Sequence, residues 1–233
     1  MEVVDWGLAR STARSFSPRG PGLSADEARS AVADLRALSR FAVDPVRERT
    51  GMDAGETPDA AVVDRQTWVD SNVEGFRVVL APLLERMATE QPGVVTSVGS
   101  RLTAVELGGV LAYLSGKVLG QYEAFATASA GRLLLVAPNI VAAERHLDVD
   151  PRDFRLWVCL HEETHRVQFG AVPWLSQHLV AEIHDYLALS ELGVGDALKR
   201  VRQGLASVVA AVRGDAGASL VDAVQTEEQR VVF

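Results

Sequence analysis

The stretch FRLWVCLHEETHRVQF, residues 154–169, decides how the rest of the chain is interpreted. Its apolar run Leu156–Leu160 is followed at once by His-Glu-Glu-Thr-His at 161–165. Just upstream, Asp150 is a preferred N-cap residue, Pro151 suits the first helical position, and Asp153 places negative charge in the first turn. These signals predict a helix from about residue 151 to Phe169, with the polar motif in its second half.

The spacing of the two histidines predicts a metal site. His161 and His165 are four residues apart, which on a helix is about 40° around the axis and about 6 Å along it, so both rings can reach one ion. Zn²⁺ binds neutral imidazole nitrogen. Glu162 can take the proton of a water molecule that the ion has made acidic. We therefore expect Zn²⁺ as cofactor, His161 and His165 as metal ligands and Glu162 as general base. A solvated helix face without metal is the alternative.

A zinc site needs a third protein ligand, and the motif does not contain one. A helix starting near Pro173 and running antiparallel to the first would bring His178 and Glu182 to the height of the two histidines. Glu182 falls on the apolar stripe of that helix, where a carboxylate needs a partner. Glu182 is therefore one candidate for the third ligand. The alternatives are a pairing with a nearby arginine, or looser packing that lets the carboxylate reach water.

The other residues of the block have plainer interpretations. Cys159 lies about 200° around the helix from His161 and is expected to be a buried small hydrophobe. Glu163 is expected to face solvent or a neighbouring helix. Trp157 and Trp174 are interpreted as core anchors. Tyr122 is interpreted as a residue at a helix end, and stabilisation of an oxyanion is the alternative.

The remaining pattern predicts an α+β fold that is strongly dominated by helices, with one or two short strands. Residues 1–23 are rich in Pro, Gly, Ser and Arg and predict an extended N-terminal arm, followed by one helical domain over 24–233. GRLLLVAPNIV, residues 131–141, is the best strand candidate, ended by Pro138 and Asn139. Helices are expected over these segments: from Ser24 to about Phe41, from Asp64 to about residue 88, after a capping box at Thr103 and Glu106, from Pro173 to about Leu192, and over 196–213 and 218–231.

Composition excludes several classes of protein. The 233 residues carry 31 acidic and 23 basic side chains, and the pI is about 5.2. No basic cluster suits nucleic acid or a membrane surface, so neither is expected as a partner. The N-terminus has Glu2 and Asp5 where a signal peptide is basic, and no apolar run is long enough to span a bilayer. With a single cysteine, the chain is expected to be cytoplasmic.

Three segments resemble a known family: VLGQYEAF (118–125), LLLVAPNIVAAER (133–145) and DFRLWVCLHEETHRVQFGAVPWL (153–175). They are similar to the zinicin-like metallopeptidases of actinobacteria, which are often labelled as associated with biosynthesis of the deazaflavin coenzyme. The resemblance runs from residue 4 to residue 175. It implies a zincin-like catalytic core with His161 and His165 as zinc ligands and Glu162 as general base.

The resemblance also implies a longer protein. Family members continue past a segment like EEQRVVF into a helix with a Leu-Glu-Gly-His-type stretch, a natural source of the third ligand. The chain is therefore expected to be truncated at Phe233, with its third ligand at Glu182 or beyond the end.

Two functions of different classes follow. The first is a zinc-dependent hydrolase that cleaves a peptide or a small amide substrate. The second is a non-catalytic helical interaction or scaffold domain that retains an incomplete metal site. The oligomeric state and the cleaved bond are not encoded in any pattern of this sequence.

Overall fold

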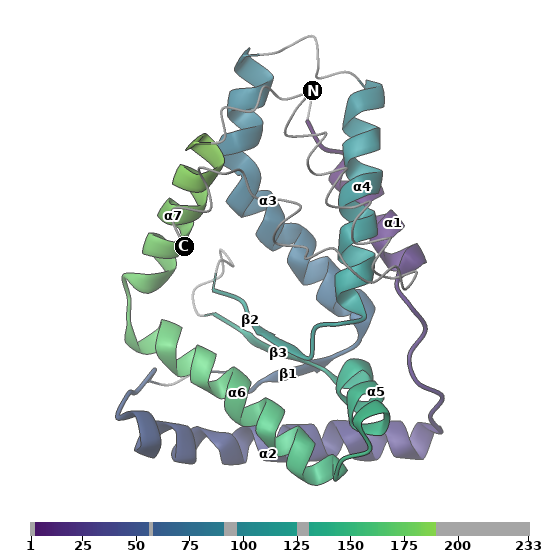
Figure 1. The fold of residues 1–233 in the computed structure, drawn as a ribbon, viewed down its shortest axis with the longest axis vertical. Helices are drawn as coiled ribbons and strands as arrows, with labels where there is room; N and C mark the ends of the chain where they lie inside the picture. The colour runs from purple at the N-terminus through teal and green to yellow at the C-terminus, as the bar shows by residue number, and fades with distance from the viewer. Residues whose placement is uncertain (1–2, 56–57, 91–96, 125–130, 190–233) are drawn as a thin grey trace.

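The computed structural model describes residues 3–55, 58–90, 97–124 and 131–189. Within these ranges seven helices surround a small sheet (Figure 1). The helices are α1 Trp6–Phe16, α2 Ala25–Thr50, α3 Arg65–Glu90, α4 Ser97–Ser115, α5 Ala137–Leu147, α6 Pro151–Ala171 and α7 Leu175–Leu189. The strands are β1 Ala61–Val63, β2 Gly120–Tyr122 and β3 Leu133–Val136. The expectation of a helix-dominated α+β fold is confirmed.

The sheet has the order β1-β3-β2, so that β3 is central. β1 pairs with β3 in parallel, with Val62 opposite Leu135, and β2 pairs with β3 antiparallel, with Gln121 opposite Leu134. All four residues of β3 are buried, as expected for a strand covered on both faces. β3 lies inside the predicted strand segment 131–141 and ends before Pro138, while the described residues hold three short strands where one or two were expected.

Two helical layers cover the two faces of this sheet (Figure 1). Because successive side chains of a strand point to opposite faces, β3 contributes to both layers. Leu135 packs in a cluster with residues of α2, α5 and α6, whereas Leu134 and Val136 pack with residues of α1, α3 and α4. The layer with α2 and α6 therefore holds the motif against the sheet.

The predicted helix starts are confirmed where local capping defines them. Ser24 and Glu27 form a capping box at α2, with both hydrogen bonds present. Asp64 accepts a hydrogen bond from the backbone N–H of Thr67 at 2.7 Å. Asp150 accepts from the N–H groups of Arg152 and Asp153, both at 2.9 Å. These caps fix the first turns of α2, α3 and α6.

The extended N-terminal arm is a wrong prediction over residues 6–16, which form helix α1. Asp5 caps this helix by accepting from the Leu8 N–H at 2.9 Å. The helix buries small side chains against α4, where a Cβ on Gly108 would lie only 2.6 Å from the Thr12 Cβ. Close packing of small residues stabilises a segment whose composition indicates a loop. The proposed boundary between an arm and a domain over 24–233 stays a prediction.

Other helix ends also differ from expectation. α2 continues past Phe41 to Thr50 and stops at Gly51, whose φ of 68° is the left-handed conformation that glycine adopts readily. α4 begins at Ser97, so the expected capping box at Thr103 and Glu106 lies inside a helix. The helices expected over 196–213 and 218–231 lie outside the described residues. In the part of the chain that is described, no helix is long and apolar enough to cross a membrane.

Candidate metal centre

Helix α6 carries the motif on its boundary between core and solvent. Val158, Cys159 and Val167 are buried, and two of them pack in the cluster shared with α2 and β3. One turn away, His161 is exposed and His165 is half-buried. The apolar run therefore anchors the helix, as its sequence indicates, and the two histidines lie on its accessible side.

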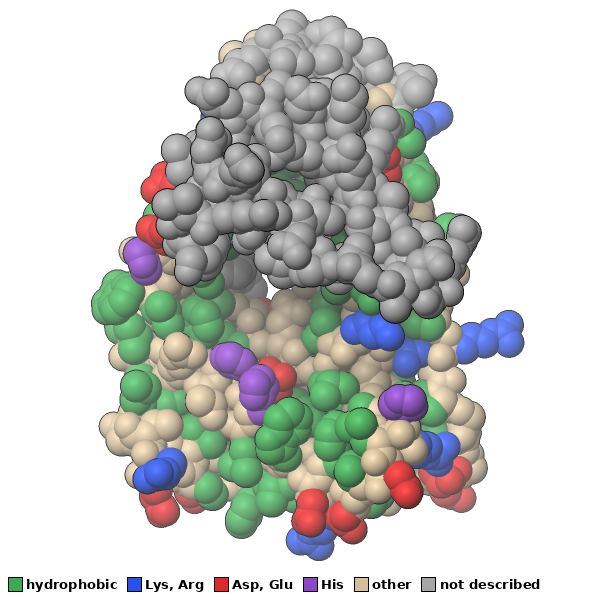
Figure 2. All heavy atoms as spheres, viewed as in Figure 1, with side chains coloured by type: hydrophobic (Ala, Val, Ile, Leu, Met, Phe, Trp, Pro, Cys, Tyr) green, Lys and Arg blue, Asp and Glu red, His purple; other side chains and the backbone are tan. Residues whose placement is uncertain are grey.

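The two imidazoles face each other closely. The Nε2 atoms of His161 and His165 are 3.3 Å apart, with ring centroids 4.8 Å apart and ring planes at 87°. Two nitrogen ligands at the usual zinc distance of about 2.05 Å, in tetrahedral geometry, lie about 3.3 Å from each other. The separation of these nitrogens and their chemistry therefore fit a shared zinc-type ion. Figure 2 shows a touching pair of histidines with acidic and apolar side chains around it.

Glu162 lies on the buried side of α6, where its side chain packs against strand β2. Its side chain is packed so closely on Gly120 that a Cβ there would lie 2.5 Å from the Glu162 Cγ and 2.6 Å from the Cδ. Only 6% of Glu162 is exposed, and this burial raises the pKa of its carboxyl group to about 7. A carboxyl group with a pKa near neutrality can both accept and return a proton at physiological pH.

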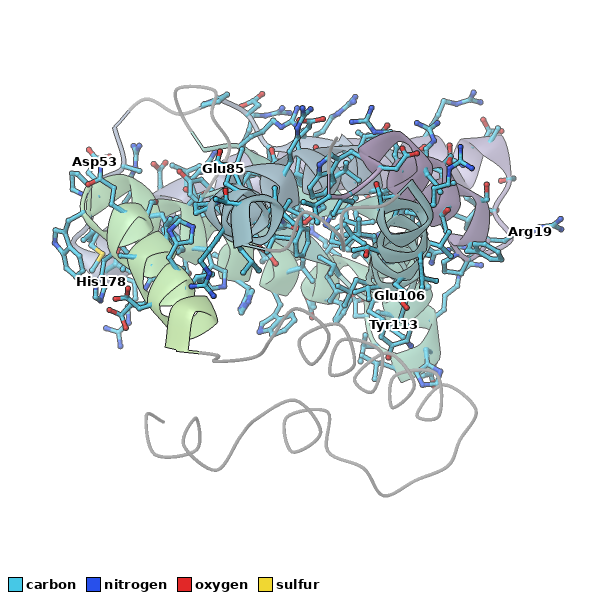
Figure 3. The ribbon with its side chains drawn as sticks, turned by 90° about the horizontal axis from the view of Figure 1, so that it is seen from above. Arg19, Asp53, Glu85, Glu106, Tyr113 and His178 are labelled. Carbon is cyan, nitrogen blue, oxygen red and sulfur yellow. The ribbon has the colours of Figure 1, made fainter. Side chains whose placement is uncertain are left out.

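Glu182 does not join the two histidines. Among the described residues, no group of three or more His, Cys, Asp or Glu side chains is arranged to hold a metal ion. The Glu182 side chain is 60% exposed, and its Oε1 atom lies 3.8 Å from Nδ1 of His178. Of the alternatives considered for Glu182, the structure therefore shows the exposed carboxylate that reaches water. Figure 3 shows its neighbour His178 at the periphery of the molecule.

The course of α7 explains this difference. The helix begins at Leu175 and packs against α3, where His184 Nε2 lies 3.0 Å from the Val79 carbonyl oxygen. In Figure 1 it turns away from α6 instead of running back along it. The other predicted source of a third ligand, a residue beyond Phe233, lies outside the described residues.

Comparison with known proteins now identifies the family. A family model described as a zincin-like metallopeptidase matches residues 4–233. The chain belongs to this family.

One solved structure is also similar to this zincin-like chain. It is a protein of Chloroflexus aurantiacus described as "a putative hydrolase with a novel fold", with a TM-score of 0.64 and 26% sequence identity, covering 97% of this chain and 74% of that one. A search of curated proteins finds no match. The zincin-like resemblance is therefore confirmed, whereas the actinobacterial origin and the link to a deazaflavin coenzyme stay predictions.

Within this zincin-like protein, Glu163 is buried, so of its two expected environments, solvent or a neighbouring helix, solvent is excluded. It is 2% exposed and forms an ion pair with Arg166, one turn further along α6. Burial raises the pKa of Glu163, and the Arg166 charge opposes that rise. Arg166 also donates to the Pro58 carbonyl at 2.9 Å, which ties α6 to the segment before β1.

Cys159 behaves as predicted. It is buried, and burial, with the nearby charges of Glu162 and Glu163 adding to it, raises the pKa of its thiol to about 12. A thiol with so high a pKa is a poor nucleophile and a poor metal ligand at neutral pH.

Both tryptophans interpreted as core anchors are instead on the surface. Trp157 is 56% exposed and stacks on His161, and Trp174 is 61% exposed and contacts His178. Each indole contacts a histidine four positions later in the chain, Trp157 within α6 and Trp174 from the turn before α7. Sequence spacing alone does not distinguish such a surface contact from core packing. The position of Trp157 beside the histidine pair is thus a finding of the structure.

Gly120 is the residue that sequence reasoning missed. It stands in the GQYE segment, where a glycine within a strand indicates close approach of another group. Tyr122, in the same strand, stacks on Phe169 of α6 with ring centroids 5.6 Å apart, and burial raises the pKa of its hydroxyl. Tyr122 therefore helps to hold β2 on α6, and a role in oxyanion stabilisation stays a prediction.

Proposed function

We propose that this chain is a zinc-dependent hydrolase that cleaves an amide bond in a peptide or a small metabolite. His161 and His165 bind the ion and Glu162 is the general base. The observation that carries the proposal is the convergence of the two Nε2 atoms at 3.3 Å, on the helix that also holds the buried carboxyl group of Glu162, the residue directly after His161. Membership of the zincin-like family supports the same chemistry.

The residues divide the work between binding and proton transfer. When bound, a zinc ion supplies Lewis acidity, which polarises a carbonyl group and makes water a stronger acid. The Glu162 carboxylate removes a proton from the water that attacks the carbonyl carbon. The resulting carboxylic acid then returns that proton to the amine nitrogen as the carbon–nitrogen bond breaks. Free acid and free amine are the products, and Glu162 is regenerated.

The edge position of strand β2 favours a peptide in extended conformation as substrate. β2 is an edge strand of the described sheet, since β3 pairs with one side of it and the order ends there. Its Gly120 lies directly against Glu162. A substrate in extended conformation can pair with such an edge through backbone hydrogen bonds, which places an amide near the base.

Metal analysis tests the proposal. We expect about one zinc per purified chain, loss of that zinc in His161→Ala, and retention in the control His146→Ala, which removes an exposed histidine of α5. Glu162→Gln should keep the metal and abolish cleavage of a peptide mixture followed by mass spectrometry. If the Glu162→Gln variant still cleaves peptides, a residue other than Glu162 is the general base.

The second candidate function is a non-catalytic helical interaction domain. It is favoured by the lack of a third ligand among the described residues. A purified chain that holds no zinc, even after incubation with excess metal, would favour this function over the hydrolase.

A further inference from the structure

Trp157 is a large apolar side chain that the fold leaves in water. More than half of it is exposed, although it lies on a helix whose adjacent residue, Val158, is almost fully buried. Exposed apolar side chains are common singly, but an exposed tryptophan beside a reactive site is informative because indole gains more than most side chains from being covered.

The indole belongs to a row of rings that leads to the proposed metal site. Phe154 stacks on Trp157 with centroids 5.9 Å apart, and Trp157 stacks on His161 with centroids 5.7 Å apart and planes at 29°. His161 in turn meets His165. A molecule held at the two histidines therefore has the indole as its immediate neighbour on the N-terminal side of α6.

Trp157 contributes little to packing between elements. Its ring contacts within the described residues are with Phe154 and His161, both on its own helix. Its exposed surface is therefore available to a group that is not part of the described fold.

We propose that Trp157 is a platform for a large apolar or aromatic side chain of the substrate, adjacent to the amide held at His161 and His165. This inference rests on the proposed function and adds a substrate class to it: peptides or amides with an aromatic or bulky aliphatic side chain next to the cleaved bond. Small and acidic side chains gain little from an indole surface.

The chain supplies its own matched control. Trp174, in the turn before α7, is as exposed as Trp157 and contacts a histidine four residues later in the chain, with centroids 5.6 Å apart. That histidine, His178, lies outside the convergent pair. Trp174→Ala therefore removes the same type of side chain from the same type of environment without touching the proposed platform.

The experiment measures binding of three amino-acid hydroxamates to the zinc-loaded full chain by calorimetry: those of phenylalanine, leucine and glycine. A hydroxamate binds metal in the same way in all three compounds, so differences report the side chain. We expect the phenylalanine compound to bind about threefold to tenfold more tightly than the glycine compound. Trp157→Ala should remove this preference, Trp157→Phe should keep part of it, and Trp174→Ala should keep all of it.

Two results would overturn the platform. The first is equal binding of all three compounds by the parent chain. The second is an equal loss for all three in Trp157→Ala together with a loss of zinc, because the indole would then only orient His161. A chain that holds zinc but shows no preference contradicts the platform alone. A chain that holds no zinc and binds no hydroxamate contradicts the proposed function, and the platform with it.

Discussion

At the scale of single residues, Glu162 is the proposed general base, and its burial is unfavourable for the charged form of its carboxyl group. Its carboxylate is buried under Gly120, and burial raises its pKa from an ordinary value near 4.5 to about 7. The folded chain therefore binds a proton more readily than the unfolded chain, so this group lowers stability as pH rises from about 4.5 to 7. The penalty persists above pH 7.

Glu162→Gln should accordingly stabilise the metal-free chain at high pH. We expect an increase of about 2–3 kcal/mol in the free energy of unfolding at pH 8, and almost none at about pH 3, where the wild-type carboxyl group is neutral in both states. Urea unfolding in the presence of EDTA measures both. The exposed carboxylate control, Glu182→Gln, should change neither value. Identical urea midpoints for Glu162→Gln and wild type at pH 8 would contradict the assigned burial.

Gly120→Ala tests the contact from the strand side. The added Cβ would overlap the Glu162 Cγ and Cδ, so either β2 or Glu162 must move. We expect a loss of about 1–3 kcal/mol in stability and, if the hydrolase proposal holds, at least tenfold lower hydrolysis with zinc content unchanged. Gly109→Ala, where a Cβ meets nothing within 4 Å, is the control.

A double-mutant cycle isolates this contact. In a Glu162→Ala background the space is free, so Gly120→Ala should cost little stability. An equal cost in both backgrounds would show that Gly120 is needed for the strand and not for Glu162.

At the scale of elements, one half-buried arginine joins three helices. Arg155 of α6 donates to both carboxylate oxygens of Glu144 on α5, at 2.6 and 2.9 Å, and to Asp34 on α2 at 2.8 Å. The hydrogen bonds with Glu144 are the main cause that raises the pKa of Arg155. Glu144 is buried, whereas Asp34 is more than half exposed.

Glu144→Gln should therefore destabilise the chain by about 2–4 kcal/mol, because it leaves the half-buried Arg155 cation with only the exposed Asp34 as a charged partner. Asp34→Asn should cost less than about 1 kcal/mol, since solvent screens an exposed pair. Urea unfolding at pH 7 checks both. Replacing both partners, in the double variant Glu144→Leu with Arg155→Met, should recover most of the lost free energy of unfolding. A destabilisation by Asp34→Asn equal to that by Glu144→Gln would contradict the greater contribution assigned to Glu144.

At the scale of the whole molecule, four residues of β3 connect two helical layers. Leu134 faces the layer of α1, α3 and α4, and Leu135 faces the layer of α2, α5 and α6 that carries the motif. Since both side chains are fully buried, the stability of each layer depends on the same strand.

Leu134→Ala and Leu135→Ala should each cost about 2.7–5 kcal/mol, within the range for buried leucines. The control Leu102→Ala, at a partly exposed position of α4, should cost far less. Thermal unfolding followed by circular dichroism and by tryptophan fluorescence should give one coincident transition for each variant. Separate transitions would show that the layers unfold independently.

The sequence by itself determined the features that depend on neighbours along the chain. Asp150 and Pro151 start α6, Ser24 and Glu27 start α2, and the four-residue spacing of His161 and His165 makes their nitrogens converge once a helix forms. The short apolar run before Pro138 likewise predicts a strand, and β3 occupies Leu133–Val136 of it, while Ala137 already begins α5. The helix-dominated fold follows from such local signals, whereas the family is predicted from the resemblance of three segments and is shown by the family model.

Only the tertiary structure decided which surfaces meet. It buries Glu163 and exposes Trp157, directs α7 toward α3 so that Glu182 stays away from the histidines, and presses Gly120 onto Glu162. The physical reason is that burial and contact depend on residues far apart in sequence, whereas caps and helical spacing depend on residues within one turn.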